Sequence, residues 1–132
     1  MRHLALVALG AISLLLPSAH AKEQQELREK VKDGVQRTDK DLSTLVNRDK
    51  LDAQQRDKFD AAVKDLNELR EAVANNRWES ERPRLERAVE NIDYLAKHAP
   101  IDDGDRQTLG IDVYTLQVIL DSWKAEPAQK HD

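Results

Sequence analysis

The strongest constraint on the fold is the spacing of the large apolar residues, which recur three or four positions apart in four successive segments. This spacing gives an α-helix one buried stripe. The stripes consist of Leu27, Val31, Val35, Leu42 and Leu45; Phe59, Val63, Leu66, Leu69 and Val73; Leu85, Val89, Ile92 and Leu95; and Leu109, Val113, Leu116, Leu120 and Trp123. No segment alternates apolar and polar residues as a half-buried strand would. The sequence therefore predicts an all-α fold with four helices.

The stripes are interrupted near residues 49–51, 75–80 and 99–102. Because these connections are short, consecutive helices are expected to be antiparallel neighbours. We expect an antiparallel up-down-up-down four-helix bundle over residues 22–125, followed by a disordered tail at 126–132. Gly34 lies inside the first stripe without changing its spacing, so one continuous helix is expected there, with a break at Asp33 and Gly34 as the alternative.

The second half of the pattern repeats the first at an offset of 50 residues. Ten large apolar positions coincide, and Asp52 and Arg56 fall on Asp102 and Arg106. Two explanations are open: a duplicated helical hairpin, or two independent hairpins with equal loop lengths. Both predict two similar hairpins, each with an apolar stripe that it cannot bury alone.

Three helix starts carry local signals. Asp52 followed by Gln55, and Asp102 followed by Asp105, place side-chain oxygens where they can accept from the free amides of a first turn. Ser80 is expected to begin the third helix, with Pro83 in its first turn, where proline removes no intrahelical hydrogen bond.

The two corner sequences, 51–56 and 101–106, carry a family resemblance. Leu51-Asp52-Ala53-Gln54-Gln55-Arg56 resembles the LTxxQ element of the Spy/CpxP-type periplasmic proteins, and Ile101-Asp102-Asp103-Gly104-Asp105-Arg106 is a looser copy. Both copies have aspartate in place of threonine, and only the first keeps the glutamine. The resemblance, about twelve residues in all, implies a small all-helical periplasmic protein that chaperones unfolded chains or modulates envelope stress. A capping box after a hydrophobic residue explains the same letters locally.

The N-terminal residues 1–21 have the pattern of a cleavable signal peptide. Arg2 and His3 precede an apolar run from Leu4 to Leu16, Pro17 ends the run, and Ala19-His20-Ala21 supplies small residues at the cleavage positions. The run is too short for a permanent membrane anchor. We expect a mature chain that begins near Lys22.

The composition limits which cellular compartments and which classes of partner fit this chain. The chain has no cysteine, so it forms no disulfide and has no thiolate metal site. An exported chain without disulfides fits the bacterial periplasm or a bacterial secreted protein. Lys and Arg number 21 against 25 Asp and Glu, with the signs interleaved, which argues against nucleic-acid binding.

The side chains that cofactors and metals require are scarce. Beyond the signal peptide the chain has His98 and His131 and no methionine, so no pair of haem ligands is available. The acids at 102, 103 and 105 lack the spacing of an EF-hand loop, which favours helix capping over calcium binding. Nothing singles out a catalytic pair. We expect no cofactor, no metal and no enzymatic activity.

The segment that joins the two hairpins is the candidate interaction surface. It combines Trp78 with Arg77, Arg82 and Arg84 around a helix start, where anions and carboxylates bind well. One hypothesis is an anion or peptide contact with Trp78 as the apolar anchor. The other is that Trp78 covers the end of the core while the arginines pair with Glu79, Glu81 and Glu86.

The fourth helix is the most apolar, because Ile111, Val118 and Ile119 widen its stripe. It is expected to be either the most enclosed helix or a self-association surface for a homodimer. Trp123 and Tyr114, with Tyr94 on the third helix, are expected in the core or at its boundary.

These features predict an exported, non-enzymatic helical bundle that acts through contacts with an unknown protein or envelope component. One alternative is a periplasmic chaperone or envelope-stress modulator of Spy/CpxP type. Another is an enzyme or small-ligand binder with a surface carboxylate and arginine site. That last class predicts a bound small molecule or a carboxylate with an abnormal titration in a cleft.

Overall fold

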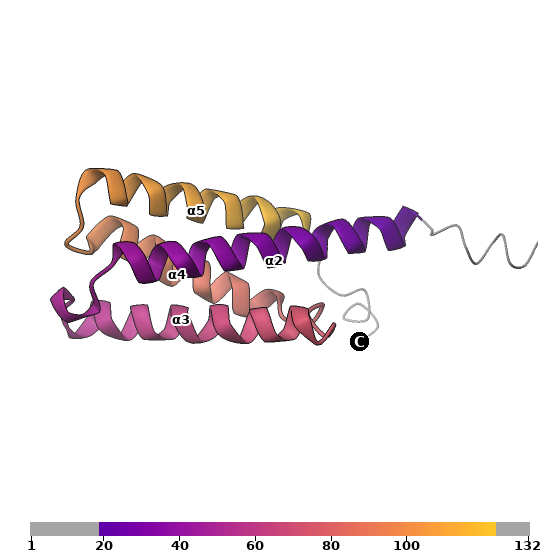
Figure 1. The fold of residues 1–132 in the computed structure, drawn as a ribbon, viewed down its shortest axis with the longest axis horizontal. Coiled ribbons are helices and arrows are strands. Elements are labelled where there is room, and N and C mark those ends of the chain that lie inside the picture. The colour runs from indigo at the N-terminus through magenta and orange to yellow at the C-terminus, as the bar shows by residue number, and fades with distance from the viewer. Residues whose placement is uncertain (1–18, 124–132) are drawn as a thin grey trace, which may run out of the picture.

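The computed structural model describes residues 19–123, and this part of the chain is helical with no β-strand. Four α-helices follow one another: α2 (Ala19–Leu45), α3 (Ala53–Ala74), α4 (Arg82–His98) and α5 (Asp103–Ser122), with a 3-10 turn η1 (Arg48–Lys50) between α2 and α3 (Figure 1). The predicted all-α, four-helix fold is confirmed.

Residues 1–18 and 124–132 lie outside the described part. Most of the predicted signal peptide and the whole predicted tail at 126–132 therefore fall outside it. The last three residues of the predicted signal peptide, 19–21, form the exposed first turn of α2. Among the described helices, none combines the length and apolar character needed to cross a bilayer.

One hydrophobic core holds the four helices together. α2 packs against α3 and α5, and α4 packs against the same two helices. The largest fully buried apolar side chains come from all four predicted stripes: Leu42, Leu66, Leu69, Leu85, Ile92, Leu95, Leu109, Leu116, Val31 and Val35. The three-and-four spacing thus identifies the core side of every helix.

Gly34 lies in the middle of α2, which is one continuous helix. A Cβ atom at this position would lie 2.9 Å from Cδ1 of Ile119 and 3.1 Å from Cδ2 of Leu116. Glycine costs about 1 kcal/mol relative to alanine inside a helix. It is used here because its missing side chain lets α2 lie close to α5.

Two helix starts form as expected and one does not. The Asp52 carboxylate accepts from Gln55 N at 2.8 Å and the Gln55 side chain accepts from Asp52 N at 3.1 Å, completing a capping box. Asp102 accepts from Asp105 N at 2.8 Å. The prediction for Ser80 is wrong: α4 begins at Arg82, and its N-cap is Glu81, one residue after Ser80, whose side chain makes no cap hydrogen bond. The Glu81 carboxylate instead binds Arg84, so it does not face the free amides.

Candidate functional site

The end of α3 sets the direction of the predicted interaction segment. Arg77 N donates to Ala72 O at 2.9 Å and Asn76 N donates to Val73 O at 3.1 Å. These are the two hydrogen bonds of a Schellman motif, and Asn76 supplies its left-handed residue with φ of 58°. Asparagine tolerates this backbone conformation better than most residues. The motif reverses the chain immediately before Trp78.

Trp78 packs into the end of the core and is 2% exposed. Its ring meets the ring of Trp123, also buried, in an edge arrangement with centroids 5.3 Å apart. This contact joins the α3–α4 turn to the C-terminal end of α5. In the described conformation Trp78 covers the core, so an anchor role would require it to leave this position.

Arg82 spans the gap between α4 and the end of α5. Its guanidinium donates to the carbonyl oxygens of Trp123 and Leu120, the latter at 3.0 Å, and to a carboxylate oxygen of Glu86 at 2.6 Å. Arg82 thus binds the carbonyl of Leu120 in the last turn of α5, which also accepts from Trp123 N, and the carbonyl of the C-cap residue Trp123. Its donors are therefore engaged by the fold.

Arg84 is surrounded by three carboxylates. Its guanidinium contacts Glu81 at 2.6 Å, Asp65 of α3 at 3.3 Å, and Glu68 of α3. The hydrogen bond to Glu81, with the nearby negative charges, raises the pKa of Arg84. Arg77, by contrast, is exposed. The structure thus brings Trp78, Arg82 and Arg84 to one end of the molecule, where each contacts other parts of the chain.

The two corner motifs occupy neighbouring positions. The Gln55 side-chain amide donates to His98 O at 2.9 Å, which ties the start of α3 to the end of α4. Arg56 donates to Leu51 O at 2.8 Å, and Arg106 donates to the equivalent Ile101 O at 2.9 Å. The repeated arginine therefore makes the same contact five residues back in each corner.

Arg106 makes further contacts with the end of α4. Its guanidinium donates to Ala96 O at 2.6 Å and to Ala99 O at 3.2 Å. These carbonyls belong to the last turn of α4 and its C-cap. The corner residues thus stabilise the turns in two ways: the aspartates cap helix starts, and the arginines donate to backbone carbonyls.

Asp112 is a buried carboxylate that the sequence reasoning missed. It lies on α5 and faces α2, is 3% exposed, and its Oδ2 atom has no hydrogen-bond partner. Removal from water raises the pKa of Asp112 to about 7, helped by a hydrogen bond with Asp41 of α2 and its charge, while Arg37 opposes the shift. The signal was present, because residue 112 lies three positions after Leu109 and four before Leu116, on the core side.

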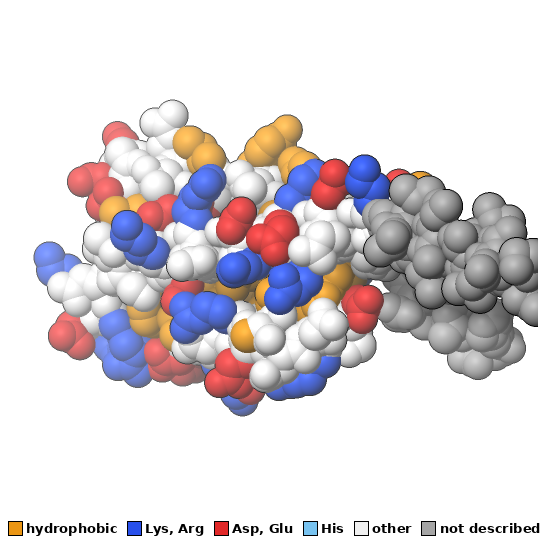
Figure 2. All heavy atoms as spheres, turned by 45° about the vertical axis from the view of Figure 1, so that its right-hand side comes forward, with side chains coloured by type: hydrophobic (Ala, Val, Ile, Leu, Met, Phe, Trp, Pro, Cys, Tyr) orange, Lys and Arg blue, Asp and Glu red, His pale blue; other side chains and the backbone are white. Residues whose placement is uncertain are grey.

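The outer face of α5 carries apolar side chains that the core does not use. Ile111 is 56% exposed, Tyr114 71% and Val118 45%. Hydrophobic side chains stand out at the top of Figure 2, along the edge where Figure 1 places α5. The expectation that Tyr114 is a core or boundary residue is wrong, and α5 is not fully enclosed. The reason is rotational: Tyr114 lies two residues before Leu116, which places it on the opposite side of the helix.

Charge is absent from this outer face. Between Gln107 and Leu120 the only charged side chain is Asp112, which is buried. We call Gln107, Ile111, Tyr114 and Val118 the uncharged face of α5. Depletion of charge around exposed aromatic and aliphatic side chains is typical of the centre of a protein interface.

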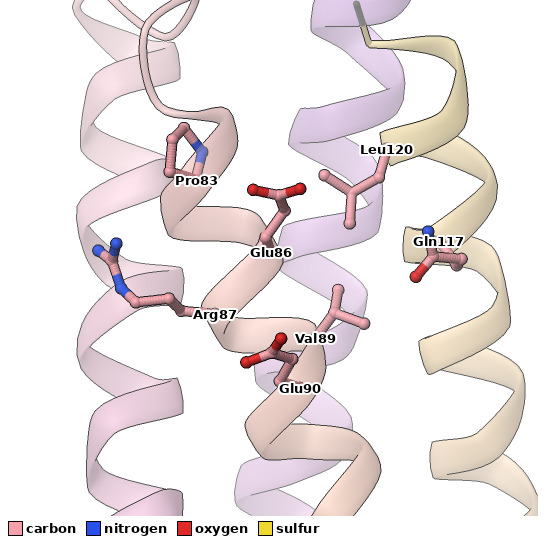
Figure 3. A pocket seen from close by; sticks show the side chains of 7 residues that line it. All are labelled: Pro83, Glu86, Arg87, Val89, Glu90, Gln117 and Leu120. Carbon is pink, nitrogen blue, oxygen red and sulfur yellow. The ribbon is translucent and has the colours of Figure 1, made fainter. Parts of the chain in front are cut away.

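An open groove runs between α4 and α5 beside this face (Figure 3). Seven residues line it: Pro83, Glu86, Arg87, Val89, Glu90, Gln117 and Leu120. Arg87 turns toward α3, where it lies 3.7 Å from Asp65. Asp112, the carboxylate with the displaced pKa, does not line this groove. Within residues 19–123, no three acidic or histidine side chains are grouped to hold a metal ion.

Comparison with known proteins adds no relative: no protein-family model, curated protein or solved structure matches this chain.

Proposed function

We propose that this chain is an exported, non-enzymatic helical-bundle protein of the bacterial periplasm or secreted space that acts through protein contacts. The contact surface is the uncharged face of α5. The observation that carries the proposal is the exposure of Ile111, Tyr114 and Val118 on a helix without an exposed charge between Gln107 and Leu120. Exposed apolar side chains that gather on one face mark interaction sites more often than apolar side chains scattered singly.

The proposed architecture is an antiparallel up-down-up-down bundle of two similar hairpins. Its support is the packing of each helix against two others, with α2 against α5 closing the set. The matching contacts of Arg56 and Arg106 support the similarity of the two hairpins. This architecture leaves one broad outer face per helix, and in α5 that face lacks charge.

Export is supported by the sequence of residues 1–21, whose short apolar run and small residues before Lys22 fit signal-peptidase cleavage. The partner is a protein or an envelope component that presents an apolar surface. The proposal includes no cofactor and no metal.

For the test, the full-length chain is expressed and its exported form is recovered from the envelope fraction. This form is then immobilised and used to capture envelope components. Val118→Lys places a charge at the C-terminal end of the uncharged face. Ala61→Lys places the same charge at an exposed position of α3. Capture that is lost with Val118→Lys and retained with Ala61→Lys supports the proposal. Equal capture by both variants contradicts it.

A chaperone of Spy/CpxP type is the second candidate, favoured by the corner sequences at 51–56 and 101–106 together with the exposed apolar face. Such a protein would slow the aggregation of an unfolded client, and Tyr114→Lys would weaken this effect because apolar client segments would meet a charge. Light scattering of a chemically denatured client during refolding measures it. No slowing by the unchanged protein at a several-fold excess counts against the candidate.

An enzyme or small-ligand binder is the third candidate, and its support is Asp112 with a pKa raised to about 7. Its burial between α2 and α5 counts against it, because a substrate would need access that 3% exposure does not provide. Protection of this helix pair from hydrogen exchange by a small ligand would favour it.

A further inference from the structure

We propose that Asp41 of α2 and Asp112 of α5 form a proton-dependent contact that determines whether α2 stays packed against α5. While the two carboxyl groups share a proton, the interface is closed. When the proton is lost, α2 separates from α5, and α3, α4 and α5 stay together. The inference goes beyond the proposed function, because it concerns the buried side of α5 rather than its uncharged face.

The α2–α5 interface lacks the polar contacts that join the other neighbouring helices. Arg28 of α2 donates to the backbone at the end of α3 at 3.0 Å, and Arg106 of α5 donates to the backbone at the end of α4 at 2.6 Å. The carboxylates around Arg84 join α3 to α4. Within the described residues, positions 22–45 of α2 reach α5 through one hydrogen-bonding pair, that of the two aspartates.

This pair makes a hydrogen bond only while one of its carboxyl groups carries a proton. Ionised carboxylates accept hydrogen bonds and cannot donate them. With a proton on Asp112, its hydroxyl donates to Asp41. Without the proton, two negative charges face each other at a site where Asp112 is 3% exposed and its Oδ2 atom has no other partner. Loss of the proton therefore replaces an attraction between the helices with a repulsion.

The groups that act on Asp112 make this change occur close to neutral pH. Burial and the neighbouring Asp41 raise the pKa of Asp112 to about 7, and Arg37 of α2 lowers it only in part. Among the described residues, no charged group of α4, the other helix packed against α5, or of α5 itself acts on Asp112. Arg37 is exposed and forms no ion pair with either aspartate. The proton is therefore what neutralises this interface.

The contacts of the other helices explain why α2 moves alone. Arg82 and Arg106 join α4 to α5 at opposite ends of the pair, and Arg84 joins α4 to α3. Arginine stays charged throughout the neutral range, so these contacts do not weaken when Asp112 ionises. Arg28 and Arg70 keep α2 attached to α3. Only the side of α2 that faces α5 is released.

The surface that the opening uncovers is apolar. Leu116 and Ile119 of α5 are buried next to Gly34 of α2 in the closed form. Val31 and Val35, on either side of Gly34, are fully buried as well. Opening thus gives the protein a second apolar surface, distinct from the uncharged face and accessible above about pH 7.

The test measures how often the α2–α5 interface opens in the purified exported form. Because the chain has no cysteine, one buried thiol can be introduced and its reaction with a small thiol reagent followed. Thr38→Cys is the probe, since Thr38 is 1% exposed and lies four residues after Gly34, on the side of α2 that faces α5. Ala88→Cys is the matched probe between α3 and α4, at a fully buried position four residues after Arg84. Each rate is divided by that of a free cysteine at the same pH, which removes the titration of the thiol itself.

Two results are expected. The corrected rate for Thr38→Cys rises about tenfold from pH 6 to pH 8, because the pKa of Asp112 is about 7 in the closed interface and close to 4 once the carboxyl is hydrated. At pH 8 this thiol also reacts about ten times faster or more than the thiol of Ala88→Cys, because a local opening is more frequent than unfolding of the whole bundle. Equal rates for the two thiols at pH 8 overturn the proposal, since the interface then opens only when the whole fold does.

A second set of variants assigns the effect to the pair. In the Thr38→Cys chain, Asp112→Asn keeps a donor to Asp41 at every pH, so the tenfold rise should disappear and the rate should stay at its pH 6 value. Asp121→Asn removes an exposed acid from the same helix and should leave the rise in place. A rise that persists with Asp112→Asn, or a rate for the Thr38→Cys chain that does not change between pH 6 and pH 8, also overturns the proposal.

Discussion

The fold neutralises two buried carboxylates by different means. One lies in the α3–α4 interface and the other in the α2–α5 interface. Asp65 of α3 faces α4, where Arg84 lies 3.3 Å away and Arg87 3.7 Å away. Asp112 of α5 faces α2, where burial and the neighbouring acid Asp41 raise its pKa and Arg37 lowers it only in part. A buried carboxylate is tolerated if it meets a cation or takes up a proton. The α3–α4 interface uses the first solution and the α2–α5 interface the second.

The largest expected effect comes from removing the cation at the α3–α4 interface. Arg84→Ala leaves Asp65, Glu68 and Glu81 without their shared guanidinium. Breaking a buried ion pair costs about 3–5 kcal/mol, and the partial exposure of Arg84 reduces this to roughly 2–3 kcal/mol in the free energy of unfolding. Urea denaturation measures the loss. Arg77→Ala, which removes an exposed arginine of the same segment, is the control and should change stability by less than about 0.5 kcal/mol.

The second effect is a pH dependence that originates at the α2–α5 interface. Because the pKa of Asp112 is raised to about 7 in the folded protein, the folded state holds a proton that the unfolded state releases near pH 4. Stability therefore falls as pH rises from about 4 to about 7, and the contribution is fully lost above that. The expected loss between pH 5 and pH 8 is about 2 kcal/mol.

Asp112→Asn isolates this contribution, since asparagine does not titrate. The variant should be more stable than the unchanged protein at pH 8 and differ little from it at pH 5, as measured by thermal unfolding at both values. An identical pH profile for the two proteins would mean that Asp112 is ionised throughout, and the comparison with Asp65 would lose its basis.

A second cation on α2, in addition to Arg37, should make the two interfaces more alike. Asp41→Lys removes the acid beside Asp112 and supplies an amino group in its place. Asp112 then gains a partner for its ionised form, so its pKa should fall and the loss of stability between pH 5 and pH 8 should shrink by about 1 kcal/mol or more. Asp39→Lys, on the same helix but paired with Arg70, should leave the pH profile of the Asp112 carboxyl in place.

The smallest effect concerns how closely α2 and α5 approach. Gly34→Ala gains about 1 kcal/mol of helix propensity but forces Ile119 and Leu116 to move, for a net loss of about 1 kcal/mol. Gly110→Ala is the matched control: its Cβ meets nothing within 4 Å, so it should raise stability by up to about 1 kcal/mol. If Gly34→Ala is as stabilising as Gly110→Ala, the close approach is not needed.

The sequence predicts the parts of this fold that depend on a single helix. The three-and-four spacing locates the core side of each helix, and the pairs at 52 and 55 and at 102 and 105 form caps, because both depend only on neighbours along the chain. Contacts between helices cannot be predicted from the sequence in the same way. Nothing in the order of residues says that Arg84 meets Asp65 or that Asp112 meets Asp41, since these contacts depend on how each helix is rotated.

The candidate site divides in the same way. The interleaved charges indicate that Arg82 and Arg84 have acidic neighbours. They do not indicate that Arg82 donates to the carbonyl oxygens of Leu120 and Trp123. Tyr114 was misplaced because an apolar residue was assumed to belong to the core. Its angular position opposite Leu116 already indicated the outer side.

The contact between Trp78 and Trp123 gives the protein an internal optical probe of one of its ends. These are the only two tryptophans in the chain, and both lie where the α3–α4 turn meets the end of α5. Indole emission during unfolding therefore reports the loosening of that end, while far-ultraviolet circular dichroism averages over all four helices. A shared midpoint for the two signals would indicate that the whole fold melts as one unit, and an earlier midpoint for emission would locate the first opening at the tryptophan pair.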